Sequence, residues 1–251
     1  MESDYKFKRV LLKLSGEAIA RKDEAGHVTE IFDGELIARI AGIIKKLVDD
    51  GVQVGVVIGG GNIWRGAYGK DVVRARADQM GMLSTMMNSL RLEDAIEKAG
   101  CPVTVMTHIG MNSFAEPYDF RKAVAYLESG KVVIFGAGLG IPFITTDTTV
   151  VVRAAEIGAD VILMAKNIDG VYTADPAGHP EAKRYRVVSY DECLAKDLHA
   201  TDISASALAK EQKINMYVFE LKEPENILRA AAGEEIGTLV TYDGSLPAEL
   251  Y

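Results

Sequence analysis

Positively charged side chains and glycines follow two apolar segments near the start of this chain of 251 residues. Lys13 lies inside the run VLLKL, which Ser15-Gly16 interrupts, and Gly59 to Gly61 follow the run VQVGVVI, with Arg65 four residues later. Glycines at the end of a strand let backbone N–H groups approach an anion, and Lys and Arg supply positive charge. These residues favour a phosphate site. A strand lysine that reaches solvent, or a tight turn followed by a surface Arg, stays open as the alternative.

A second glycine-rich segment strengthens the phosphate interpretation. The run KVVIF is followed by GAGLGIPFITTD, residues 136–147. Thr145 and Thr146 can supply hydroxyl and backbone donors, and Asp147 is expected to cap the helix that follows. GxGxG alone is a weak signal, but two such turns after two strands of one sheet favour a site for two phosphate groups.

Two further segments carry groups suited to a nucleoside. Asp78 falls in the first turn of an expected helix, where it either favours the helix dipole or accepts hydrogen bonds from sugar hydroxyls. The loop after residues 160–165 contains Tyr172 and Asp175, which suit packing against adenine and binding of ribose. A surface hairpin with solvated carboxylates is the alternative for this loop.

Hydrophobic periodicity indicates the elements that would position these groups. Strands are expected at residues 10–14, 52–58, 103–107, 131–135, 160–165, 215–219 and 238–241. Helices are expected from residue 33 to 50, from 76 to 99, up to 127, from 147 to 157, near 189–196, over 203–212 and near 225–232, with a hairpin or loop over 17–32. The first strand, helix and strand predict a right-handed parallel βαβ unit and an α/β fold.

Bulk composition limits the partners and the compartment. The length suffices for one large α/β domain, and a formal charge of −8 argues against nucleic acid or a membrane surface as main partner. Cys101 and Cys193 lie far apart, and the four histidines show no ligand spacing, so no disulfide framework or structural zinc is expected. Because no apolar run suits a signal peptide or a membrane span, a cytoplasmic protein is expected.

Several common catalytic signatures are missing from the sequence. There is no GxxxxGK[ST] motif, GGGNIWRG departs from GxGxxG, and no serine lies in a GxSxG elbow. The remaining pattern favours phosphoryl transfer between two anions, which needs positioning and charge neutralisation more than covalent chemistry. Lys13, Arg65, backbone N–H groups and Mg²⁺ could supply both.

Five motifs, in the same order, resemble those of bacterial UMP kinases in the amino-acid kinase superfamily. They are KLSGEA (13–18), GGGNIWRG (59–66), RADQMGML (76–83), GAGLGIPFITTD (136–147) and AKNIDGVYTADP (165–176). The resemblance implies one domain over residues 1–251, a three-layer αβα sandwich on a mainly parallel sheet of about eight strands. Its acceptor-binding part would span about 1–160 and its ATP-binding part about 161–251.

The resemblance also implies an activity and its partners. The reaction would be ATP + UMP → ADP + UDP in pyrimidine nucleotide biosynthesis, with Mg²⁺ held mainly through the phosphates and no residue assigned as a direct metal ligand. The enzyme would be a homohexamer, with GTP and UTP as candidate effectors.

The same resemblance assigns site residues. Lys13, Asp147 and Asp202 would be catalytic, with Asp147 organising Lys13 and water or Mg²⁺. The ATP-binding residues would be Lys13, Leu14, Ser15, Gly16, Gly61, Arg65, Lys166, Asn167, Tyr172 and Asp175. The UMP-binding residues would be Gly60, Asp78, Leu139, Gly140, Ile141, Pro142, Phe143, Ile144, Thr145 and Thr146.

The chain departs from the family pattern in the acceptor loop. Where the family reads GTGNPFFTTD, Leu139 replaces a threonine and Ile141 an asparagine; Thr201 also replaces a methionine, and residues 108–112 are atypical. A lost polar contact to the base would cost on the order of 1–3 kcal/mol, although backbone groups can still read uracil.

Two rival functions follow from these departures. One is a superfamily kinase that acts on an amino acid or on isopentenyl phosphate, against which Asp78 and PFITTD argue. The other is a nucleotide-binding storage or regulatory protein, similar to the molybdenum storage proteins. The presence of Lys13, Arg65, Asp147 and Asp175 favours a working enzyme.

Overall fold

Strand β1 (Arg9–Leu14) lies inside the central sheet and carries Lys13. A computed structural model describes residues 5–23, 26–64, 71–198 and 201–251. Side chains of a strand alternate between the two faces of the sheet. Leu12 and Leu14 therefore belong to one hydrophobic core and Leu11 to the other. Lys13 points to the same face as Leu11, where its ammonium group reaches Asp147.

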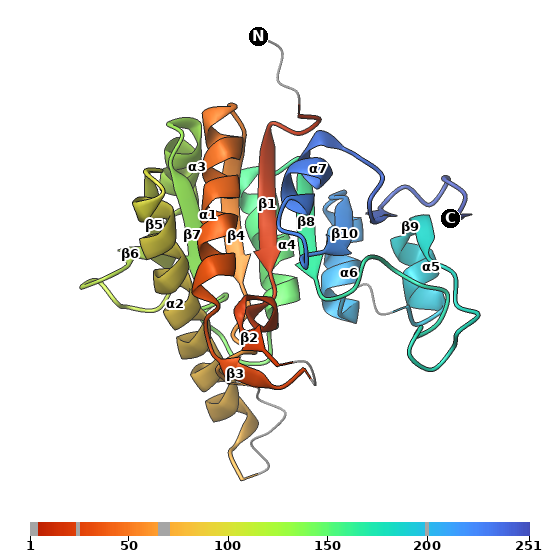
Figure 1. Ribbon diagram of the computed structural model, residues 1–251, viewed down its shortest axis with the longest axis horizontal. Coiled ribbons are helices and arrows are strands. Elements are labelled where there is room, and N and C mark those ends of the chain that lie inside the picture. Colours follow the sequence, from red (N-terminus) through yellow and green to blue (C-terminus); the bar gives the residue numbers. More distant parts are fainter. Residues whose placement is uncertain (1–4, 24–25, 65–70, 199–200) are drawn as a thin grey trace.

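Ten strands of the described residues form the central sheet, in the order β12-β9-β11-β10-β8-β1-β4-β7-β5-β6. The other nine are β4 (Gln53–Ile58), β5 (Val103–Thr107), β6 (Glu116–Pro117), β7 (Val132–Gly136), β8 (Val161–Lys166), β9 (Tyr185–Ser189), β10 (Met216–Glu220), β11 (Thr238–Thr241) and β12 (Glu249–Leu250). Figure 1 labels most of these strands, from β5 and β6 on the left to β9 on the right. All neighbours pair in parallel except β10 with β11 and β9 with β12. The mainly parallel sheet is confirmed, and two-residue strands at both edges extend it beyond the eight expected.

Helices cover both faces of the sheet and complete three layers (Figure 1). One face carries α1 (Gly34–Asp49), α2 (Arg74–Lys98) and α7 (Asn226–Ala232), whose buried residues share a core. The other carries α3 (Phe120–Glu128), α4 (Thr146–Ile157), α5 (Tyr190–Ala195) and α6 (Ile203–Glu211). Among the described residues no helix is both long and apolar enough to cross a membrane.

Local signals place several helix ends correctly. The Asp33 carboxylate accepts hydrogen bonds from the backbone N–H groups of Glu35 and Leu36, and so caps α1 as predicted. Gly158 has φ of 63° and ends α4 in the left-handed conformation that glycine tolerates. The segment predicted as a hairpin or loop contains the 3₁₀ helix η1 (Gly16–Ile19), and within it β2 (Arg21–Lys22) pairs antiparallel with β3 (Val28–Glu30).

Two helix starts differ from the prediction. Helix α2 begins at Arg74, so Asp78 lies after the first turn and not within it as predicted. The helix dipole acts most strongly on charges in the first turn, so it contributes little at Asp78. Helix α4 is capped by Thr145, whose hydroxyl accepts hydrogen bonds from the N–H groups of Asp147 and Thr148 at 3.1 Å each. The prediction of Asp147 as the cap is wrong, because its carboxylate points to Lys13 instead.

Strand β9 has no counterpart among the predicted strands. Its parallel partner β11 begins about fifty residues later, and its antiparallel partner β12 lies later still. A short segment that depends on such distant partners carries little local signal.

Candidate active site

The carboxyl ends of β1 and β4 are pressed together. The Gly59 N–H donates a hydrogen bond to the Leu14 carbonyl oxygen at 2.9 Å. A Cβ atom on Gly16 would lie 2.4 Å from the Gly59 carbonyl oxygen, so only glycine fits there. A Cβ atom on Gly59 would in turn lie 3.8 Å from the Thr146 hydroxyl oxygen. The two strand ends and the N-terminus of α4 therefore meet at one place.

A cluster of ionic groups occupies this meeting point. Lys13 Nζ of β1 lies 2.7 Å from Asp147 Oδ1 of α4, and Lys166 Nζ of β8 lies 3.6 Å from Asp147 Oδ2. The Thr201 hydroxyl donates a hydrogen bond to Asp147 Oδ2 at 2.9 Å. Lys13 is 7% exposed, so its ammonium group has few partners other than this carboxylate or a ligand. Asp147 thus holds the two lysines from neighbouring strands.

The protonation states follow from this arrangement. Burial raises the pKa of the Asp147 carboxyl, but the charges of Lys13 and Lys166 outweigh burial and lower the pKa to about 2. Burial lowers the pKa of Lys166, with Asp147 acting in the opposite direction. Asp147 is therefore ionised at neutral pH, and its negative charge favours the protonated form of the neighbouring Lys166.

A cavity of about 140 Å³ opens on the β4 and β7 side of this cluster, and we call it the loop cavity. Gly60 and Thr146 line it near the ionic cluster, and Asp78 of α2 lines it as well. Seven of the predicted UMP-binding residues line the loop cavity: Gly60, Asp78, Leu139, Ile141, Ile144, Thr145 and Thr146. Gly140, Pro142 and Phe143 are not among its lining residues.

Asp78 holds the loop between β7 and α4, which borders the loop cavity and contains Gly140 and Phe143. Its carboxylate accepts a hydrogen bond from the Phe143 N–H at 2.9 Å and pairs with Arg74 Nε at 2.9 and 3.0 Å. Phe143 has φ of 69°, a conformation that non-glycine residues adopt rarely and that needs support. A Cβ atom on Gly140 would lie 3.3 Å from the Cβ of His108, so the atypical segment 108–112 contacts this loop.

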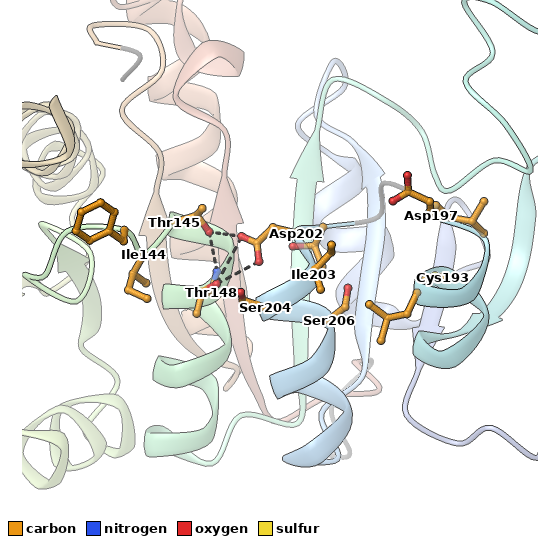
Figure 2. A pocket seen from close by; sticks show the side chains of 13 residues that line it. Ile144, Thr145, Thr148, Cys193, Asp197, Asp202, Ile203, Ser204 and Ser206 are labelled. Carbon is orange, nitrogen blue, oxygen red and sulfur yellow. Dashed lines mark hydrogen bonds between the residues drawn. The ribbon is translucent and has the colours of Figure 1, made fainter. Parts of the chain in front are cut away.

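A second hollow, of about 640 Å³, lies between α4, α5 and α6, and we call it the helix hollow. Figure 2 shows Thr145, Thr148 and Asp202 pointing toward one another at its wall. The Asp202 carboxylate caps α6 through the Ala205 N–H at 2.7 Å and accepts hydrogen bonds from both threonine hydroxyls. Asp202 therefore ties the N-terminus of α6 to that of α4.

A third hollow, of about 400 Å³, lies beyond β8, and we call it the tyrosine hollow. Lys166, Tyr172 and Asp175 line it together. Asn167, assigned with them from the sequence, instead lines a separate hollow with Glu17 and Glu220. Lys166 therefore links the tyrosine hollow to the ionic cluster.

The remaining predicted ATP-binding residues are placed as follows. Leu14 is fully buried, so only its backbone is available to a ligand. Ser15 precedes η1 and makes no side-chain capping hydrogen bond. Gly61 follows Gly60 directly in the turn after β4. Arg65 lies outside the described residues.

Sequence reasoning missed two supporting residues. Thr201, a departure from the family pattern, donates a hydrogen bond to the Asp147 carboxylate. Asn88 of α2 is fully buried, and its amide donates to the Gly59 carbonyl at 2.6 Å and to the Asn62 side chain at 2.7 Å. A polar residue on the apolar face of a helix was the one available signal for Asn88, because buried polar groups are nearly always hydrogen-bonded.

Comparisons with known proteins agree with this geometry. The amino acid kinase family profile matches residues 8–220. The crystal structure of UMP kinase from Bacillus anthracis is 40% identical, covers 98% of this chain and 99% of its own, and has a TM-score of 0.87. UMP kinase from Ureaplasma parvum is 34% identical, and the match covers 93% of this chain and 98% of that protein with a TM-score of 0.87. Uridylate kinase from Archaeoglobus fulgidus is 28% identical, and the match covers 92% of this chain and 99% of that protein with a TM-score of 0.70.

Proposed function

Because this chain belongs to the amino acid kinase family and, within it, to the UMP kinases, we propose that it transfers the γ-phosphoryl group of ATP to UMP. The products are ADP and UDP. One observation carries the proposal: the Lys13–Asp147–Lys166 cluster lies between the loop cavity and the tyrosine hollow. Lys166 lines the tyrosine hollow, and Thr146, next to Asp147, lines the loop cavity.

The cluster supplies what phosphoryl transfer requires of a protein. The transition state spreads negative charge over the oxygens of the transferred group, so fixed positive charge stabilises it. Lys13 carries that charge at the meeting point of β1, β4 and α4, and its burial limits competition from water. Asp147 orients Lys13 and is already ionised, so it needs no proton transfer to do so.

UMP occupies the loop cavity in this proposal. Its phosphate lies against Gly60 and Thr146, where backbone N–H groups of the α4 N-terminus favour an anion. Its ribose bonds to Asp78, whose carboxylate keeps acceptor capacity after its contacts with Arg74 and Phe143. Uracil packs near Leu139 and Ile141 and is read through backbone groups, since both side chains are apolar.

ATP occupies the opposite side of the cluster. Adenosine packs against Tyr172 and bonds to Asp175 in the tyrosine hollow, and the phosphates extend past Lys166 toward Ser15 and Gly16. The acceptor-binding part then corresponds to about residues 1–160 and the ATP-binding part to about 161–251. Gly61 and Arg65 keep their proposed ATP contacts, of which that of Arg65 falls outside the described residues. Asn167 lines a separate hollow, so it is not placed against adenosine in this proposal.

Mg²⁺ suits this donor set when it is held through phosphates. Among the described residues, no group of three His, Cys, Asp or Glu side chains converges to hold a metal ion. Asp147 and Asp202 supply carboxylate oxygens near the cluster, and Mg²⁺ usually combines one or two carboxylates with substrate phosphates and water. When bound, the ion neutralises charge on the β- and γ-phosphates.

We extend the proposal to assembly, regulation and compartment. We propose a homohexamer from family membership, and an interface between copies of the chain is supported by Leu83 and Met87, which lie one helical turn apart on α2 and are 52% and 48% exposed. Control by GTP and UTP and a cytoplasmic location follow from family membership alone. Adding each nucleotide to the assay below tests the control.

A coupled assay of ADP release tests the proposed function. Mg²⁺-ATP is supplied with UMP, CMP, dTMP or no acceptor, and we expect turnover to be highest with UMP. Turnover with another acceptor but not UMP would indicate a different kinase of the family. Nucleotide binding without turnover with any acceptor would indicate a storage or regulatory protein.

A further inference from the structure

Arg184, just before β9, is bound to the loop that carries Tyr172 and Asp175. Its Nη1 lies 2.6 Å from Asp169 Oδ2 and also donates to the Asp169 carbonyl oxygen at 3.3 Å. The same Asp169 carboxylate accepts a hydrogen bond from the Tyr172 hydroxyl at 2.8 Å. Asp169 therefore joins Arg184 to the aromatic ring of the tyrosine hollow.

The Arg184 side chain lies closely against the backbone of this loop. A Cβ atom on Gly170 would come within 2.8 Å of Arg184 Cδ, so glycine leaves the space that the side chain fills. The backbones of Tyr172 and Arg184 form an antiparallel bridge, and the Tyr185 N–H donates to the Val171 carbonyl at 2.8 Å. Backbone hydrogen bonds thus hold the loop against the start of β9.

Tyr251 covers the other side of the guanidinium group. Its ring centroid lies 4.1 Å from Arg184 Cζ, within the range of a cation–π contact. The Tyr251 hydroxyl reaches the carbonyl oxygens of Glu235 and Gly237 at 3.0 and 2.9 Å, and its N–H donates to the Arg184 carbonyl at 3.1 Å. Strand β12 directly before it pairs with β9, which fixes the position of the ring.

We propose that Tyr251 and Arg184 are positioning residues for the donor nucleotide, acting through Asp169 on Tyr172. Neither Tyr251 nor Arg184 lines the tyrosine hollow, so they act without touching the nucleotide. The inference rests on the proposed function, in which that hollow binds adenosine. If the Tyr172 ring is already held in place, less conformational entropy is lost when ATP binds. The contact between Tyr251 and Arg184 therefore favours the affinity for ATP rather than the rate of the transfer step.

The proposal predicts a split between donor binding and turnover. In Tyr251→Ala, we expect KM for ATP to rise about threefold to tenfold, the range of a cation–π contact that is partly shielded from water. We expect kcat and KM for UMP to stay within about twofold, because the loop cavity and the ionic cluster are unaffected. Tyr251→Phe keeps the ring over Arg184 and should restore most of the donor affinity.

Tyr242→Ala is the matched control. Like Tyr251, Tyr242 is a partly exposed tyrosine; it follows β11 and is 39% exposed. Its contact with Asn215 is made by its backbone N–H and not by its ring. We expect its KM for ATP to match the wild type. A second readout is hydrogen exchange of the amides of residues 169–175 without nucleotide, which should be faster in Tyr251→Ala than in Tyr242→Ala.

Two results would overturn the inference. One is an unchanged KM for ATP in Tyr251→Ala with unchanged exchange in the loop. The other is an equal loss in Tyr242→Ala, which would indicate general weakening of this segment. Calorimetry with ATP separates the proposed function from the positioning role. If the wild-type chain binds ATP but does not phosphorylate UMP, only the proposed function is overturned. The positioning role is then tested by comparing the ATP Kd of the variants with that of the wild type. A chain that binds no ATP overturns both.

Discussion

At the scale of single residues, Lys13 is the side chain on which the proposed reaction depends most. It extends from a buried strand, is itself 7% exposed, and contacts Asp147 at 2.7 Å. A lysine in this environment needs a negatively charged partner. The transferred phosphoryl group would be such a partner.

We expect Lys13→Ala to fold and to lose nearly all transfer activity. Removal of one preorganised charge of this kind costs about 10²- to 10³-fold in kcat. Lys166 stays near Asp147 and limits the cost in stability. The coupled assay and a thermal melt measure both effects, with the exposed Lys8→Ala as control. Near-normal turnover of Lys13→Ala would withdraw its assigned role.

Asp147 makes stability depend on pH in the acid range. Its folded pKa of about 2 is below the usual aspartate value of 3.8, so the ionised form stabilises the fold. This contribution, about 2–3 kcal/mol, is complete above about pH 5 and is lost as pH falls toward 2. In urea unfolding, the stability advantage of wild type over Asp147→Asn should therefore shrink between pH 6 and about pH 3. A constant difference would contradict the assignment.

Asp78 is expected to contribute to the binding of the acceptor UMP and not to the binding of ATP. In Asp78→Ala, KM for UMP should rise about tenfold or more, because a charged hydrogen-bond acceptor is lost and the Phe143 N–H loses its partner. KM for ATP should change little. Gln79→Ala, an exposed neighbour on α2, is the control. An unchanged KM for UMP in Asp78→Ala would argue against ribose at this position.

At the scale of elements, the turn after β4 is fitted tightly against α2. A Cβ atom on Gly60 would lie 2.8 Å from the Ser84 Cβ and 3.1 Å from the Gly81 carbonyl oxygen. The Asn88 amide of the same helix donates a hydrogen bond to the Gly59 carbonyl oxygen. The helix therefore determines where the glycine turn lies and how wide the loop cavity is.

Gly60→Ala should force α2 and this turn apart. We expect the free energy of unfolding to fall by about 1–3 kcal/mol, as for other overpacked sites, together with weaker UMP binding. Gly42→Ala in α1 is the control, since no atom lies within 4 Å of its added Cβ and helical alanine stabilises by about 0.5–1 kcal/mol. Urea unfolding and KM for UMP measure the two effects. A Gly60→Ala variant as stable as wild type would contradict the predicted clash.

At the scale of the whole molecule, β1 divides the proposed donor and acceptor sides. It pairs with β4 on one side and β8 on the other, both in parallel. Ligands of open parallel sheets bind beyond the carboxyl ends of the strands, where the chain turns to opposite sides. The loop cavity and the tyrosine hollow occupy the two sides of this point.

The proposed assembly is tested on the exposed face of α2. Light scattering of the wild type should give a mass six times that of one chain. Leu83→Glu would place a charge on this exposed apolar face, the proposed interface, and should reduce that mass. Lys98→Glu, on the same helix and solvent-exposed, is the control. A wild-type monomer would contradict the hexamer.

Much of the fold follows from the sequence alone. Alternating and helical periodicity locates most strands and helices, because burial of one face is a local pattern. Asp33 marks the start of α1 correctly, since a cap needs only its own next residues. The glycine turns after β1, β4 and β7 identify the edge of the sheet where ligands are expected.

Tertiary structure alone decided which partners these residues have. The residue types alone cannot tell that Asp147 binds Lys13 while Thr145 caps α4, because both side chains suit a helix start; only the family resemblance linked Asp147 to Lys13. It also cannot show that Asp202 joins α6 to α4, or that β9 forms, since each needs a partner dozens of residues away. Periodicity records which face of an element is buried, but hydrogen bonds and ion pairs between elements depend on how those faces pack.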